Sequence, residues 1–95
     1  MLESQGRMSI GSELIERCKH ISINAELNMF YNQEKKALVL KAKGFEPVDG
    51  MYFVASLKTD DKGRITMPLS VRKAFPDVDY LPTERNGEIY IFIIT

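Results

Sequence analysis

Four basic residues that could bind a nucleic acid lie close together in the second half of the chain. Lys62 and Arg64 flank Gly63, and Arg72 and Lys73 follow a few residues later. A guanidinium is planar and can hold a phosphate or a guanine edge through two parallel hydrogen bonds. An arginine at a tight turn projects from a rigid scaffold, so Arg64 could hold a phosphate or a guanine edge in this way, whereas spacing alone does not single out Arg72 and Lys73.

Simpler explanations exist for each of these charges. Arg64 could merely pair with Asp60 or Asp61 across the turn, which as a surface ion pair would contribute about 0–1 kcal/mol. Arg72 and Lys73 could form an ordinary solvated helix face. The whole chain carries 13 basic and 13 acidic residues. This balance excludes a protein that binds nucleic acid through net positive charge, but it allows a local basic face.

Other polar groups give no sign of catalysis. Cys18 and His20 are two residues apart, so on a helix they would not face each other, and no acidic residue is placed to orient them. Cys18 is the only cysteine and His20 the only histidine, which argues against a metal site and excludes a disulfide framework. We therefore expect no enzyme, no cofactor and no metal. We expect Cys18 to be a buried thiol.

The elements that would position the basic residues follow from local patterns. The apolar and aromatic run of 51–58 predicts a strand, a turn ends at Gly63, and 64–67 predicts a short returning strand. Pro68 is suited to the first position of a helix over 69–75, which Pro76 ends. The predicted helix buries Leu69, Val71, Ala74 and Phe75 and exposes Arg72 and Lys73.

The C-terminal segment predicts a hairpin. Pro82 restricts 80–83 to an edge strand, and Asn86-Gly87 is a strong hairpin turn. The last strand, 88–95, is apolar on both faces from Ile89 to Ile94, which predicts that both of its faces are covered. Four lysines near an earlier hairpin are expected to lie on strand edges and block edge pairing: Lys35, Lys36, Lys41 and Lys43.

The first half repeats this order of elements. The letters from Gly6 (GRMSIGSELIERC) align without a gap with those from Gly63 (GRITMPLSVRKAF). A strand over 26–31, a turn over 32–36 and a strand over 37–42 then predict a second hairpin. We interpret 1–43 and 51–95 as two units, joined by 43–50, that bury each other's faces as one interleaved domain. The alternative is a chance match, since the aligned block is short.

The segment Asp60–Lys73 resembles the core signature of the AbrB/SpoVT swapped-hairpin family. It has an acidic turn, Gly63-Arg64, a short apolar strand, Pro68 and a short helix with a basic pair. The resemblance covers Val54 to the C-terminus and, more weakly, Leu2 to Ala42. It implies a mainly β protein with short helices, a swapped-hairpin barrel of two tandem, MraZ-like units that form an internal pseudo-dimer. Gly63, Pro68 and Gly6 would be its structural turn residues.

The resemblance also implies a function. Members of this family are chiefly transcriptional regulators that bind duplex DNA and act by promoter occupancy. Carried over to this sequence, the DNA contacts are Arg64, Arg72, Lys73 and Lys62 in the second unit, with Arg7 and Arg17 in the first. The expected partners are duplex DNA and the protein itself, as a pseudo-dimer or homo-oligomer. With no signal peptide and no membrane helix evident, a cytoplasmic location is expected.

Several departures keep other functions open. Ile15 and Glu16 stand where the first unit would carry its basic pair, and Gly11 replaces the proline. Only Leu2, Glu3 and Ser4 precede the first turn, so the opening strand of the first unit is expected to be nearly absent, its place filled by another chain or by nothing. One alternative is a protein-binding member that has lost DNA contact, such as an inhibitor of a host regulator. Another is an antitoxin of the MazE/VapB type, which the expected absence of a C-terminal tail argues against.

Overall fold

The computed structural model describes residues 6–18, 21–22 and 24–94. Its elements, in chain order, are β1 (Arg7–Ser9), α1 (Ser12–Glu16), β2 (Glu26–Asn32), β3 (Ala37–Ala42), β4 (Met51–Lys58), β5 (Arg64–Thr66), α2 (Leu69–Ala74), β6 (Asp79–Arg85) and β7 (Glu88–Ile94). The expectations for Leu2–Ser4, His20 and Thr95 lie outside the described residues. The protein is mainly β with two short helices, as the sequence predicts.

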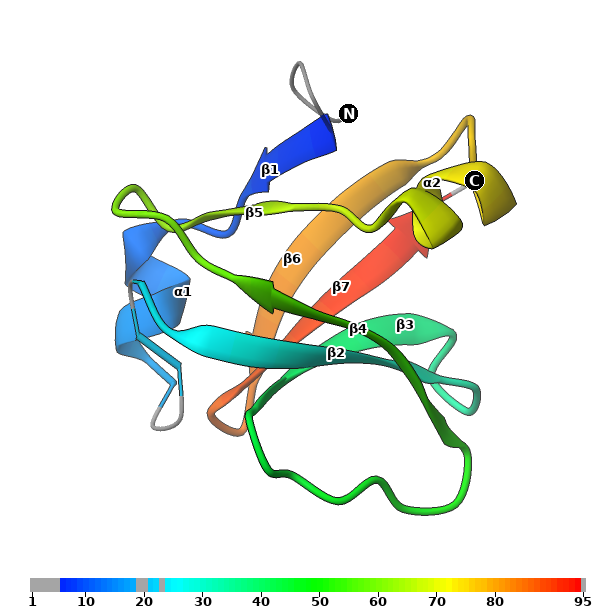
Figure 1. Ribbon diagram of the computed structural model, residues 1–95, viewed down its shortest axis with the longest axis horizontal. Coiled ribbons are helices and arrows are strands. Elements are labelled where there is room, and N and C mark those ends of the chain that lie inside the picture. The colour runs from blue at the N-terminus through cyan, green and yellow to red at the C-terminus, as the bar shows by residue number, and fades with distance from the viewer. Residues whose placement is uncertain (1–5, 19–20, 23, 95) are drawn as a thin grey trace.

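The strands form two sheets (Figure 1). Five strands lie in the order β4-β2-β3-β7-β6, and β1 pairs with β5 in a separate two-stranded sheet, called here the β1–β5 ribbon. The sheets are not closed into a barrel, because β4 and β6 each pair on one side only within the described part of the chain. Strands from both halves of the sequence therefore share one sheet.

The main core lies between the five-stranded sheet and the ribbon. It joins side chains from both halves, including Leu27, Met29, Leu38, Leu40, Ile89 and Ile91 from the sheet, and Met8, Ile65, Met67, Ile15 and Val71 from the ribbon and the helices. Each is at most 5% exposed, so the two halves share one buried core that stabilises both.

The outer face of the five-stranded sheet, opposite the main core, carries a smaller cluster. Val39 and Tyr90 pack there with Ala37, and the partly buried Met51 and Phe92 lie against them. The last strand is thus covered on both faces in its middle, as predicted. Ile94 differs, being 47% exposed, because β3 pairs with β7 only as far as Phe92 and, among the described residues, the end of β7 is paired with β6 alone.

The hairpins follow from their turn residues. Asn86 and Gly87 have φ values of 55° and 80°, the left-handed backbone that a two-residue hairpin turn requires. The turn between β2 and β3 is longer, and the backbone N–H of Lys35 donates to Asn32 Oδ1 at 3.0 Å. The predicted strand bounds agree with the structure within one residue in the first hairpin, while β6 extends two residues beyond the predicted 80–83, to Arg85.

The ribbon has a local two-fold arrangement centred on Met8 and Ile65. Arg7 pairs with Thr66, Met8 with Ile65 and Ser9 with Arg64. Beyond these pairs, the N–H of Ile10 donates to the carbonyl of Gly63 at 2.9 Å, and the N–H of Met67 donates to the carbonyl of Gly6 at 2.8 Å. These crossed hydrogen bonds join each half to the turn of the other half. Gly6 and Gly63 have matching φ values of 75° and 72°.

Helix α2 begins at Leu69, as predicted, and ends at Ala74, one residue before the predicted end. Pro68 is not the first helical residue but precedes the helix with an extended backbone (φ −56°, ψ 143°). Val71 and Phe75 face the core, being four residues apart and therefore on one side of the helix. Leu69 is 55% exposed, because it lies two positions before Val71 and so on the opposite side of the helix. Ala74 is exposed as well.

Candidate nucleic-acid interface

The outward side of the ribbon presents two arginines. Met8 and Ile65 point into the core, so their neighbours along each strand point the other way. Because Arg7 is paired with Thr66 and Arg64 with Ser9, all four side chains share one surface, called here the ribbon face. The two arginines lie at opposite ends of it, about 7 Å apart along the strand direction.

Asp60 holds Arg64 in place. The Arg64 side chain donates from Nε to Asp60 Oδ2 at 2.8 Å, and its backbone N–H donates to Asp60 Oδ1 at 2.8 Å. The N–H of Lys62 donates to the same Oδ1 at 2.9 Å. The Arg64 backbone bond, more than the guanidinium, lowers the pKa of Asp60 to about 2. Arg64 therefore closes its turn by pairing with Asp60, the simpler role that the sequence also allowed.

Arg72 does not point outward, contrary to the prediction. Its side chain is half-buried and donates from Nε to the carbonyl of Met67 at 3.2 Å. Its guanidinium lies against the turn of the other half, since a Cβ placed on Gly6 would come within 2.8 Å of Arg72 Cζ. The physical reason is the crossed pairing of the ribbon, which brings Gly6 under the inner side of α2.

Ile15 packs against the turn glycine of the second half, Gly63, as Arg72 packs against Gly6. It is 4% exposed, and a Cβ on Gly63 would lie 3.0 Å from Ile15 Cδ1. Ile15 and Arg72 occupy matching positions in the two aligned segments, which begin at Gly6 and Gly63. Each one therefore covers the turn glycine of the other half, and this position serves packing in both.

The remaining predicted basic residues are exposed but dispersed. Lys62 lies in the β4–β5 turn near the ribbon, Lys73 on α2 and Arg17 at the end of α1. The two helices lie on opposite sides of the molecule (Figure 1), so Arg17 and Lys73 are not brought together. Exposed Glu13 and Glu16 also lie on α1. The structure thus gathers Arg7 and Arg64 on one face and leaves the others around it.

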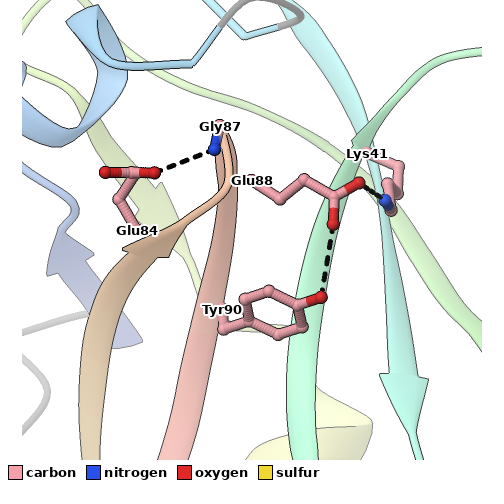
Figure 2. A network of polar contacts seen from close by, with 5 residues as sticks. All are labelled: Lys41, Glu84, Gly87, Glu88 and Tyr90. Carbon is pink, nitrogen blue, oxygen red and sulfur yellow. Dashed lines mark hydrogen bonds and ion pairs between the residues drawn. The ribbon is translucent and has the colours of Figure 1, made fainter.

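Lys41 of β3 forms a polar network with Glu88 and Tyr90 of the neighbouring strand β7 (Figure 2). The sequence instead predicted Lys41 at a strand edge. Lys41 bonds Glu88 through its ammonium group, and the Tyr90 hydroxyl donates to Glu88 Oε2 at 3.2 Å. Lys41 is 14% exposed and lies over the Phe45 ring at 4.6 Å. Burial lowers the pKa of Lys41. Lys41 is therefore not an edge lysine, because β3 lies in the middle of the sheet; its apolar run Ala37–Leu40 was the available signal.

The network lines a cleft of about 310 Å³, together with Ile21, Leu40, Ala42, Phe45 and Gly87. Glu84 closes the adjacent turn by accepting a bond from the Gly87 N–H at 2.8 Å (Figure 2). Lys41 and Glu88 neutralise each other, so this cleft offers an incoming ligand mainly apolar walls.

Cys18 is a buried thiol, as predicted. Its Sγ donates to the Leu14 carbonyl at 3.3 Å, and burial is the main cause that raises its pKa. Among the described residues, no three His, Cys, Asp or Glu side chains are grouped so as to hold a metal ion. None of the helices within the described ranges is long and apolar enough to cross a membrane.

A scan against protein-family models and searches of curated proteins and of solved structures return no match to this chain.

Proposed function

We propose that this protein binds duplex DNA through the ribbon face and regulates transcription by occupying a promoter. The observation that carries the proposal is the pair of arginines, Arg7 and Arg64, set two-fold symmetrically on a two-stranded β-ribbon. The major groove of B-DNA admits a two-stranded ribbon, and the backbone of a duplex is itself locally two-fold symmetric. Arginines at the two ends can then meet phosphates or guanine edges on opposite strands.

The contacts around Arg64 suit such a role. Asp60 fixes the direction of the guanidinium through Nε, so less side-chain freedom is lost when DNA binds. The carboxylate also reduces the local positive charge, and the whole chain is neutral. Exposed Lys62 and Lys73 add positive charge beside the ribbon face, whereas Arg72 supports the fold from within. We therefore expect the protein to make few contacts with DNA phosphates, and its DNA affinity to depend only weakly on salt concentration.

The finer fold assignment is part of the same proposal. We infer an open variant of the swapped-hairpin fold, in which each half supplies a strand–helix–hairpin unit. The repeated order of elements, the crossed hydrogen bonds at Gly6 and Gly63, and the pairing of β4 with β2 of the other half support it. In this reading the ribbon is where the two units cross.

Fluorescence anisotropy with a labelled random duplex, at two salt concentrations, tests the DNA proposal. Arg7→Ala and Arg64→Ala should each weaken binding and lower the slope of log K against log salt by about 0.9. Lys36→Ala, in the exposed β2–β3 turn away from the ribbon, is the matched control and should leave the slope unchanged. No affinity for any duplex at low salt would overturn the proposal.

A protein-binding role without DNA contact is the second candidate. Two of the predicted DNA-binding arginines already have partners within the chain, since Arg64 is paired with Asp60 and Arg72 packs against Gly6. Helix α1 also exposes Glu13 and Glu16, whose charge would repel phosphate. An absence of DNA binding together with capture of one partner whose binding is lost in Arg7→Ala would favour it.

A further inference from the structure

Two lysines at the C-terminal end of β3 form ion pairs of the same kind in different surroundings. Lys43 bonds Glu26 at 2.8 Å, and the two side chains are 69% and 64% exposed. Lys41 bonds Glu88 of β7, but these side chains are 14% and 34% exposed. Burial lowers the pKa of Lys41, whereas the hydrogen bond to Glu26 raises the pKa of Lys43. Because burial of an ion pair costs solvation free energy, the Lys41–Glu88 pair indicates a binding role more than a gain in stability.

This pair lines the cleft of about 310 Å³, called here the Lys41 cleft. The other lining residues carry no charge: Ile21, Leu40, Ala42, Phe45 and Gly87. Clefts that hold small ligands begin at about 300 Å³ and combine mainly apolar walls with a few polar groups. An apolar cavity of about 150 Å³ holds one benzene molecule. The Lys41 cleft therefore has the size and the lining suited to a single substituted ring.

The polar pair has a hydrogen-bond donor to offer in this cleft. An ammonium group has three N–H donors. One donor of Lys41 bonds Glu88 Oε1, and the face of the Phe45 ring, 4.6 Å from Nζ, can receive a second. No described residue accepts a hydrogen bond from the third, so it is available to a ligand. The Glu88 oxygens each accept a bond already, one from Lys41 and one from the Tyr90 hydroxyl (Figure 2).

We propose that the Lys41 cleft binds a small, neutral, mainly apolar molecule whose carbonyl oxygen accepts a hydrogen bond from Lys41. The apolar part of the molecule packs against the uncharged walls of the cleft. A charged ligand of either sign would lose its hydration and gain no net attraction, because Lys41 and Glu88 neutralise each other. A carbonyl oxygen needs only the one available donor. This inference does not rest on DNA binding.

NMR titration of the isotope-labelled full chain with three probes that share one ring tests the class of ligand. Acetophenone is neutral and has a carbonyl oxygen, benzoate is anionic, and ethylbenzene has no acceptor. Acetophenone should shift the amide signals of Leu40, Ala42 and Gly87, with a dissociation constant of about 1 mM or lower. Ethylbenzene lacks the hydrogen bond and benzoate must lose its hydration, so each should bind about tenfold more weakly.

Two double variants decide whether the buried ion pair sets this preference. Lys41→Met/Glu88→Leu replaces the pair by apolar side chains, which commonly preserves stability, and it should weaken acetophenone binding about tenfold without weakening ethylbenzene binding. Lys43→Met/Glu26→Leu removes the exposed pair and is the matched control, which should bind acetophenone like the wild type. Thermal melting confirms that both variants fold. The proposal is overturned if acetophenone moves no cleft signal up to about 10 mM, if benzoate binds as tightly, or if the cleft variant keeps its acetophenone affinity.

Discussion

Position 15 in α1 and position 72 in α2 occupy the same place in the two halves and carry opposite kinds of side chain. Ile15 is buried against Gly63, and Arg72 is half-buried against Gly6. Read from the sequence alone, an isoleucine in place of an arginine suggests a lost DNA contact. The structure shows instead that this position covers the turn of the other half, which an aliphatic chain and the stem of an arginine can both do.

Substitutions at these two positions should have the largest and most different effects on the free energy of unfolding. Ile15→Ala leaves a cavity in the main core and should cost about 2–5 kcal/mol of unfolding free energy. Arg72→Ile keeps aliphatic cover over Gly6 and loses one hydrogen bond, worth about 0.5–1.5 kcal/mol. Chemical denaturation monitored by circular dichroism measures both. Equal losses in the two variants would show that the guanidinium contributes more than cover.

The two turn glycines should respond differently to an added methyl group. Gly6→Ala and Gly63→Ala both force a side chain into left-handed backbone, at about 1–2 kcal/mol each. At Gly63 the methyl also meets buried Ile15, adding about 1–3 kcal/mol of overpacking. At Gly6 it meets the far end of the flexible Arg72 side chain, which can move aside at the cost of its hydrogen bond to Met67, about 0.5–1.5 kcal/mol. Gly87→Ala gives the backbone cost alone, since no described atom beyond its chain neighbours would come closer than 4.0 Å to the new methyl group. The expected order of destabilisation, from the largest, is Gly63, Gly6, Gly87.

The ion pair at the second turn predicts a small effect of pH. The folded-state pKa of Asp60 is about 2, below the value near 3.9 in an unfolded chain. Its contribution is therefore complete above about pH 4 and is lost as the pH falls towards 2. Melting temperatures of the wild type and Asp60→Asn, compared from pH 7 to pH 2, should converge at low pH. A constant difference would show that the carboxylate charge is not the cause.

The turns and the strands could be predicted from the sequence, because residues close together along the chain determine them. Asn86-Gly87 specifies a hairpin, and the aromatic and β-branched run of 51–58 specifies a strand, because turn backbone and strand preference are local properties. The buried Cys18 followed from its alignment with an apolar position. Gly63 likewise has the positive φ expected of its turn.

The wrong predictions concern features that depend on contacts between residues far apart in the sequence. The inward side of α2 depends on how the ribbon docks the helix, so Arg72 was expected outside and Leu69 inside. The prediction that Lys41 lies on an edge is wrong because β7 pairs beside β3. That pairing joins residues about fifty positions apart, and no local sequence pattern indicates it. In the candidate site, the two arginine positions were predictable from the repeat, but their shared face came from the pairing of β1 with β5.

The central place of β7 has a consequence for how the protein is made. β7, whose residues are the last that the structure describes, lies between β3 and β6 rather than at an edge. The ribbon likewise needs β5 before β1 has a partner. On the ribosome, the first half therefore emerges with its sheet edge and core face uncovered, and it stays so until the segment around Ile91 has left the exit tunnel. This sheet therefore cannot be completed before β7 is synthesised, and until then the nascent chain is most exposed to aggregation and to chaperones.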